Sequence, residues 1–188
     1  MTTVTQAGPI PGYVAGTWTI DPVHSEVGFS VRHMMVSKVR GKFTRFSGEI
    51  VTADDVLSSA VKAEIDLSSI DTGAPQRDGH LQSADFFDIE HHPLMTYTST
   101  GIRRDGEDYV LEGNLTLRGV TKAVPLALEL NGFGPDAYGG TRAGFTATGE
   151  INRQDFGVSW NAAMETGGVV VADKVAIHLE IEAVLQAK

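Results

Sequence analysis

The amino-acid sequence predicts an all-β fold, an antiparallel up-and-down barrel of about eight strands with one short helical segment. Apolar residues alternate with polar ones in segment after segment, as in strands that are buried on one face only. Turn residues such as glycine, aspartate and proline separate these segments. Because only one stretch carries a helical signal, the strands have to cover one another, as a closed barrel or as a two-sheet sandwich.

The strands follow one another along most of the chain. Asp105-Gly106 predicts a tight hairpin turn, and Arg118-Gly119 predicts the next one. Pro125 favours an edge or bulged position, and "NGFGPDAYGGT" is predicted to be a glycine-rich loop. The alternating segments cover residues 18–20, 27–31, 39–43, 48–50, 61–67, 95–99, 109–117, 124–130, 143–151 and 175–185.

Three segments depart from the strand pattern. In "APQRDGHLQSADFFDIEHHP", Pro75 suits a first helical turn and Leu81 and Phe86 could face a core, although Gly79 weakens the helix. The stretch "RQDFGVSWNAAMETGGVVV" lacks periodicity and is interpreted as a mobile flap or a bulged strand. Residues 1–15 carry Gly and Pro without periodicity, so we expect a flexible N-terminal arm before a single domain at 16–188.

The amino-acid composition excludes several classes of function. The net charge of -9 argues against a nucleic-acid partner, whose binding surface would be basic. The absence of cysteine excludes disulfides, thiolate catalysis and cysteine-based zinc sites. The first residues have neither a basic start nor an apolar run, so we expect a cytoplasmic protein.

The inward faces decide whether the barrel is filled or hollow. A barrel of about eight strands either fills with side chains or holds one ligand. Here large and small inward residues are mixed, as in Val39, Gly41 and Phe43. The small residues either leave room for a ligand or mark bends and bulges that close the sheet.

Several motifs give the chain a family resemblance. They are "GTWTIDPVHSEVGFSVRHMMVSKVRGKFTRFSG", "IDLSSIDTGAPQRDGHLQSADFFD", "LEGNLTLRGVTKAVPL", "RAGFTATGEINRQDFGV" and "VADKVAIHLEIEA". In this order and spacing, from about residue 16 to 183, the chain resembles the YceI-like family of polyisoprenoid-binding proteins. Many members of that family carry an export signal, which this sequence does not show.

The resemblance implies a fold and a ligand. It implies a lipocalin-like barrel that holds an isoprenoid lipid, such as a polyprenyl phosphate or the tail of an isoprenoid quinone, in an apolar channel. The expected function is that of a soluble, non-catalytic carrier, store or sequestering protein, with the isoprenoid as ligand and no cofactor. Transient membrane contact and a homodimer are further expectations.

Four polar residues are candidates for the head group of that lipid. His33 follows Val27, Phe29 and Val31 in the inward phase, so it could lie where the channel ends. Arg77, whose fork binds phosphate well, could instead pair with Asp78 or Asp85 on the surface, and His33 could instead be buried and bonded to a neighbouring carbonyl. The full set of head-group candidates is His33, Arg77, His80 and Arg142.

Apolar residues are candidates for the wall around the tail. Aromatic rings offer flat surfaces and methionines, including Met34 and Met35, adapt to irregular chains, although most such residues are ordinary core. The tail candidates are Val27, Phe29, Val31, Phe43, Phe145, Trp160, Met164, Ile177 and Leu179.

Rival functions have weaker support. A hydrolase acting on an isoprenoid-like substrate would use His33 or His80 as base with Asp71, Asp78 or Asp85, but no nucleophile elbow, phosphate loop or dinucleotide motif is present. A metal site from His91 and His92 with Asp88 or Glu90 is disfavoured, because adjacent residues of an extended chain point to opposite sides. A filled barrel acting as a protein-interaction module is the remaining alternative.

Overall fold

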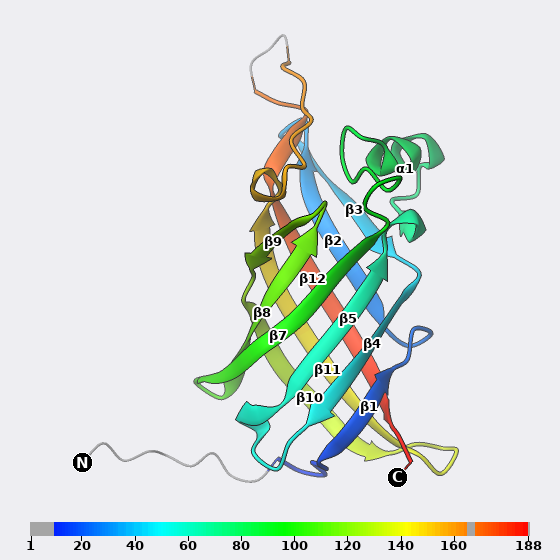
Figure 1. Cartoon of the computed structure of the whole chain (residues 1–188), viewed down its shortest axis with the longest axis vertical. Helices are drawn as coiled ribbons and strands as arrows, with labels where there is room; N and C mark the ends of the chain where they lie inside the picture. Colours follow the sequence, from blue (N-terminus) through cyan, green and yellow to red (C-terminus); the bar gives the residue numbers. More distant parts are fainter. Residues whose placement is uncertain (1–9, 165–167, 188) are drawn as a thin grey trace, which may run out of the picture.

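A computed structural model describes residues 10–164 and 168–187 and places them in one antiparallel barrel (Figure 1). Eight strands form the ring, in the order β1-β4-β5-β7-β8-β10-β11-β12, and β1 pairs with β12 to close it. The strands are β1 (Gly16–Ile20), β2 (Glu26–His33), β3 (Ser37–Phe43), β4 (Phe46–Thr52), β5 (Ala60–Asp66), β6 (Ile70–Asp71), β7 (Leu94–Asp105), β8 (Asp108–Leu117), β9 (Val120–Ala123), β10 (Leu126–Pro135), β11 (Thr141–Asn152) and β12 (Val171–Leu185). The predicted all-β antiparallel barrel is confirmed.

The β2–β3 hairpin departs from a simple up-and-down order. β12 pairs with β1 only through its last residues, at Ala183–Leu185, and pairs with β2 along Val171–Glu180. β3 then pairs with β2, while its other edge contacts only the two residues of β6. The hairpin therefore extends one end of the barrel wall, at the end where α1 lies and away from the chain termini (Figure 1).

One α-helix is present in the described residues, α1 (Pro75–Gln82), with proline at its first turn as predicted. No helix in residues 10–164 and 168–187 has the length and apolarity needed to cross a bilayer. Short 3-10 turns η1 (Val56–Ser58), η2 (Leu67–Ser69) and η3 (Arg153–Phe156) connect strands. Leu81 of α1 and, after the helix, Phe86 and Phe87 face the barrel interior.

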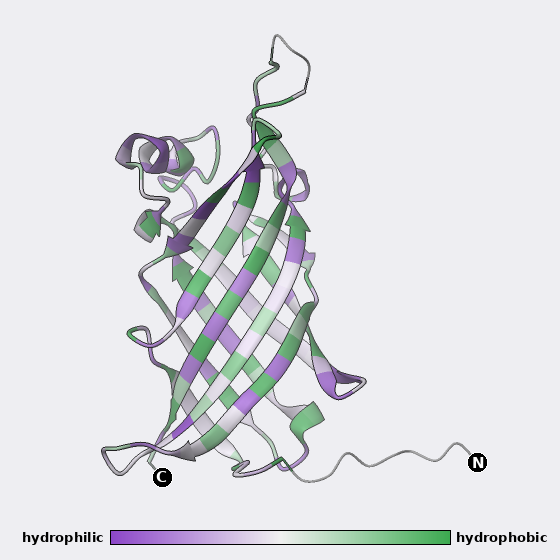
Figure 2. Ribbon diagram, turned by 180° about the vertical axis from the view of Figure 1, so that it is seen from behind, coloured by the Kyte–Doolittle hydropathy of each residue, from purple (hydrophilic) through white to green (hydrophobic). Residues whose placement is uncertain are grey.

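The chain alternates hydrophobic and hydrophilic residues along the long strands, as Figure 2 shows. The inward residues form two buried clusters. The larger one includes Leu67, Phe86 and Leu126, and the smaller one surrounds Trp18 at the end where the termini lie.

The predicted loop at 131–141 is shorter than expected. β10 continues to Pro135 with a register shift between Leu130 and Gly132, and only the turn at 136–140 separates it from β11. The glycines of "NGFG" therefore belong to a strand, where a bulge absorbs the irregularity. Pro125 lies in a break between β9 and β10, which both pair with β8, in accord with its missing N–H group.

The stretch interpreted as a flap or bulged strand is irregular. It begins with η3, makes one isolated bridge between Ala163 and Val169, and joins β12 at Val171. Residues 165–167 lie outside the described residues, as do residues 1–9 of the predicted N-terminal arm. The rest of that arm lies against the barrel end, because Tyr13 donates a hydrogen bond of 2.6 Å to the Ala53 carbonyl and its ring packs on Phe133.

The inward glycines have a packing role that the sequence did not indicate. A Cβ at Gly113 would lie 2.5 Å from the Tyr97 ring, and one at Gly149 would lie 2.6 Å from Leu126. A Cβ at Gly41 would collide with the Phe29 ring. These glycines neither leave empty space nor serve only as bends, because a neighbouring large side chain fills the position that each vacates.

Candidate functional site

An elongated cavity of about 270 Å³ runs through the barrel. It extends from Tyr13 and Phe133 near the termini to Val31 and Val171 at the α1 end. Of the nine predicted tail residues, seven line it, namely Val27, Phe29, Val31, Phe43, Phe145, Ile177 and Leu179. A cavity that extends along most of the length of a barrel is suited to a long, thin, apolar ligand.

The inward residues of β2 remain partly accessible. Val27, Phe29 and Val31 are half-buried although they point inwards, and so are Val175 and Ile177 of β12 beside them. Their free surface faces the cavity. By contrast, Phe145 is 8% exposed because it packs against Phe133 in the smaller core cluster.

Trp160 and Met164, the other two tail candidates, are not among the lining residues. The Trp160 ring packs outside the cavity, with its centroid 4.8 Å from that of His80 and 5.4 Å from that of Phe86. Met164 donates its backbone N–H to Gly168 within the irregular segment. The lack of periodicity around both residues could not show which side chains face inwards.

The buried polar groups on the wall already have partners. The Tyr97 hydroxyl donates to the Val124 carbonyl at 2.8 Å, and burial raises the pKa of Tyr97 to about 12. Thr52 accepts a hydrogen bond of 2.8 Å from Trp18 and donates one to Val14. No buried side-chain polar atom in the described part of the chain lacks a partner, so the wall offers a ligand little but apolar surface.

Arg153 is a cavity-lining residue that sequence reasoning missed. Its side chain donates hydrogen bonds to the carbonyls of Ala172 (2.8 Å), Val158 (2.7 Å), Trp160 (2.9 Å) and Val171 (3.2 Å). The residue is 3% exposed, and desolvation lowers the pKa of its guanidinium. The arginine therefore fastens the irregular segment to the start of β12 at the α1 end of the cavity.

The local sequence predicts part of the arrangement around Arg153. Asn152 caps η3 by accepting from Gln154, and Gly157 ends the turn with a φ of 73°. These residues predict a tight turn around Arg153. They do not predict its burial, because the four carbonyls come from segments up to 19 residues away.

Three of the four head-group candidates lie at the α1 end. His33 ends β2 opposite Ser37 and Val171, half-buried but outside the lining. Arg77 donates to both the hydroxyl and the carbonyl of Thr72 at 2.7 Å, so it pairs with neither of the expected aspartates. His80 bonds Asp85 at 2.8 Å.

Arg142 lies at the opposite end of the barrel, beside the last residues of β12. Its guanidinium is 2.8 Å from Asp21 and 3.1 Å from Asp136. The strand order places it there, because β11 begins where β12 ends. The structure therefore does not bring Arg142 together with the other three candidates.

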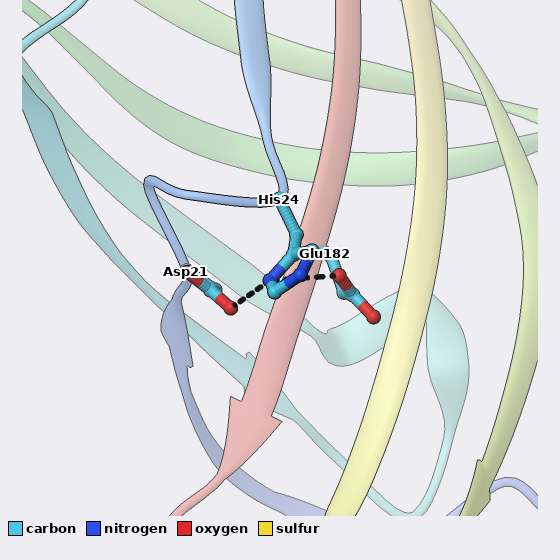
Figure 3. A group of neighbouring side chains, drawn as sticks. All are labelled: Asp21, His24 and Glu182. Atoms are coloured by element: carbon cyan, nitrogen blue, oxygen red, sulfur yellow. Dashed lines mark hydrogen bonds and ion pairs between the residues drawn. The ribbon is translucent and has the colours of Figure 1, made fainter. Parts of the chain in front are cut away.

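The same end holds a group of Asp21, His24 and Glu182 (Figure 3). His24 Nδ1 lies 2.7 Å from Asp21 and 3.6 Å from Glu182, so the imidazole stands between the two carboxylates. Hydrogen bonds from Arg142 and then His24 hold the pKa of Asp21 far below its usual 3.8. Arg142 supplies the positive charge here, and the group joins the β1–β2 loop to β11 and β12.

The rival site residues do not form a site in the cavity. His91 Nδ1 bonds Asp88 at 3.0 Å, which raises the pKa of His91. Among the described residues, only Asp21, His24 and Glu182 place three potential metal ligands close together. Asp78 accepts from Thr72. Neither His80 nor Asp85 lines the cavity.

The comparisons with known proteins agree with this architecture. The crystal structure of Burkholderia cenocepacia BcnA matches with a TM-score of 0.74 at 24% identity, covering 87% of this chain and 98% of that one. The YCEI protein of Campylobacter jejuni matches with a TM-score of 0.70 at 30% identity, covering 89% and 96%. A polyisoprenoid binding domain from Saccharophagus degradans, implicated in plant cell wall breakdown, matches with a TM-score of 0.68 at 18% identity, covering 92% and 100%.

Two relatives found by sequence have higher identity to this chain than these solved structures. A UPF0312 protein of Pectobacterium carotovorum is 44% identical over 138 residues, which are 72% of this chain and 71% of the relative. Protein YceI of Escherichia coli is 42% identical over 149 residues, covering 77% and 78%. The family model described as the YceI-like domain matches residues 18–183. The chain therefore belongs to the YceI-like domain family.

Proposed function

We propose that this protein binds the hydrocarbon chain of an isoprenoid lipid inside its barrel and carries or stores it without chemical change. The observation that carries the proposal is the elongated cavity, whose wall is apolar along its length and whose buried polar groups are already bonded. The Saccharophagus degradans domain, named for polyisoprenoid binding, has the same fold.

The length of the cavity suits a short polyisoprenoid. Its lining on β12 extends from Val171 to Ile181, about 33 Å along the strand at roughly 3.3 Å per residue, or about 25 Å along the barrel axis at a tilt near 40°. An extended isoprene unit is about 5 Å long, from four bonds of about 1.5 Å in a zigzag. The cavity is therefore about as long as five extended units, and a longer chain has to fold or protrude.

Burial in the cavity favours the lipid over water but not over a membrane. Each isoprene unit of about five carbons gains about 4 kcal/mol on leaving water, at roughly 0.8 kcal/mol per carbon group. A bilayer offers nearly the same gain, and ordering the chain opposes capture. Exchange with a membrane is therefore close to balanced, as a carrier requires, and selectivity comes from the head group and chain length.

The head group is expected at the α1 end. His33 and Arg77 stand there, while the other end is closed by packed aromatic rings and its cation, Arg142, is held by Asp21 and Asp136. Arg153 faces the cavity but uses its donors on backbone carbonyls. His33 and Arg77 are thus the candidates for a phosphate or quinone oxygen, and Arg142 is dropped.

A binding role is preferred to catalysis because the acid–base pair is misplaced. His80 and Asp85 are bonded to each other outside the cavity, where they cannot reach a chain bound within it.

The test is mass spectrometry of an organic extract from protein purified without detergent, and again after incubation with isoprenoid-containing vesicles. A stoichiometric prenyl lipid is expected. Val175→Trp, which adds bulk inside the cavity, should abolish it, whereas Ala176→Trp on the outer face should not. A blank in both preparations of the wild type would refute the proposal and favour a filled barrel that binds other proteins.

A further inference from the structure

The β2–β3 hairpin has a charge that sets it apart from the rest of the chain. Between Glu26 and Glu49 there is no acidic residue, although the chain has 24 Asp and Glu and a net charge of -9. The same stretch holds five of the 15 Lys and Arg, namely Arg32, Lys38, Arg40, Lys42 and Arg45. A local basic strip on an acidic protein indicates a partner of negative charge.

The strip faces outwards and is not neutralised. Arg32 stands directly opposite Lys38 in the β2–β3 register, and Arg40 follows on the same exposed face. In the described ranges none of these three is within 4.0 Å of a carboxylate, whereas Arg45 pairs with Asp66. Like charges directly opposite each other destabilise a sheet, so nothing in the described part of the molecule explains the arrangement.

The tip of the hairpin is apolar and strained. Met34 and Met35 occupy the central positions of the turn at φ values of 51° and 62°, a conformation that favours Asn and Gly. Their exposed fractions are 42% and 63%, and that of Val36 is 85%. Val169, 40% exposed, lies close by, because Met34 donates its N–H to the Val170 carbonyl.

The tip also stands at the end of the cavity. Val31 lines the cavity two residues before His33, and Val171, opposite His33 on β12, lines it as well. A ligand leaving at this end passes the tip directly. The three features therefore coincide at one place: an apolar tip, a basic strip and the end of an apolar channel.

We propose that the β2–β3 hairpin docks the protein on the surface of an anionic bilayer, with Met34, Met35 and Val36 in the interface and Arg32, Lys38 and Arg40 on lipid phosphates. Charge complementarity and exposed apolar side chains at one edge are what interfacial binding needs. The inference rests on the proposed function, since it names the membrane from which the channel is loaded.

Flotation with vesicles tests whether the basic residues of the hairpin are needed for membrane binding. We expect the wild type to float with vesicles of equal parts phosphatidylcholine and phosphatidylglycerol, to float poorly with phosphatidylcholine alone, and to lose binding as salt is added. Lys38→Gln with Arg40→Gln should lower binding roughly 25-fold, at about fivefold per residue near an anionic surface. The matched control, Lys62→Gln with Arg104→Gln, removes two exposed cations elsewhere and should change little.

A second variant separates docking from folding. Met34→Asn with Met35→Gly installs the residues that this turn prefers, so it should raise the unfolding midpoint while it weakens binding roughly tenfold. A loss of binding in this variant cannot be attributed to misfolding.

The outcomes also distinguish the two proposals. Equal flotation of wild type and hairpin variants, or none with either vesicle, overturns docking even if the extract contains an isoprenoid. Hairpin-dependent flotation with a blank extract supports docking and refutes isoprenoid carriage.

Discussion

Replacement of Arg153 by methionine separates a structural role from a ligand-binding role at the end of the channel. Methionine has similar length and no donors, so Arg153→Met removes the hydrogen bonds to Val158, Trp160 and Ala172 while keeping most of the buried volume. The Val171 carbonyl keeps a partner, because Asn161 also donates to it at 2.8 Å.

Arg153→Met is expected to lower the free energy of unfolding substantially. A hydrogen bond from a charged donor contributes about 1.5–3 kcal/mol, and each buried carbonyl left without a partner costs about 1–3 kcal/mol. These effects overlap and local rearrangement recovers part of them, so we expect a loss of about 3–5 kcal/mol in the free energy of unfolding. For a chain of this length that lowers the melting temperature by roughly 6–20 °C.

Urea and thermal unfolding followed by tryptophan fluorescence would measure this, with Arg104→Met as control. Arg104 is exposed and lies 5.5 Å from the Tyr109 ring centroid, an interaction of about 0.5–1 kcal/mol. If Arg153→Met unfolded within about 1 kcal/mol of the wild type, Arg153 would not be the fastener described here. It would then be a free cation and the first candidate for the lipid head group.

Two further predictions address the closed end and the wall. The lowered pKa of Asp21 means that its charged form stabilises the fold above its unfolded pKa near 3.8 and that this contribution is lost as pH falls towards the folded value. Urea midpoints should therefore fall below pH 3.8 in the wild type and fall less in Arg142→Gln; parallel curves would contradict this. Gly113→Ala should lower the free energy of unfolding by about 1–3 kcal/mol, because the hydrogen-bonded Tyr97 ring cannot move away from the new Cβ. Gly132→Ala should be nearly neutral, because nothing lies within 4 Å of its Cβ. Equal melting temperatures of the two variants by calorimetry would count against this reasoning.

Alternation predicted the inward residues because the pleat of a strand fixes them locally. Phe29, Val31, Ile177 and Leu179 line the cavity as their phase indicates. The rule did not apply to Trp160, a candidate chosen for its aromatic ring, because it lies in an irregular segment where spacing does not determine direction. His33 shows the intermediate case, since it continues the inward phase of β2 but lies beyond the last lining residue, Val31.

What the sequence could not predict depends on strand order. Arg142 was grouped with His33 because it opens an inward-apolar strand, but β11 begins where β12 ends, whereas β2 ends opposite the start of β12. Arg153 was missed because its partners come from the irregular segment and from the start of β12, which only the tertiary fold brings together around it. Local patterns predict the turn around Arg153 but not its burial, and they do not show at which end of the barrel Arg142 lies.

In the part of the chain that the structure describes, positive side chains are paired with carboxylates at one end of the barrel and unpaired on the hairpin at the other, and this difference affects how the protein would orient on a membrane. At the closed end Arg142 is surrounded by Asp21, Asp136 and Glu182. At the other end Arg32 and Lys38 face each other without a carboxylate in reach among the described residues. Most of the surface of a chain with net charge -9 is repelled by anionic lipid, so attraction is confined to the hairpin end. The same charges that would hold the protein on a bilayer would therefore also turn its channel towards the lipid.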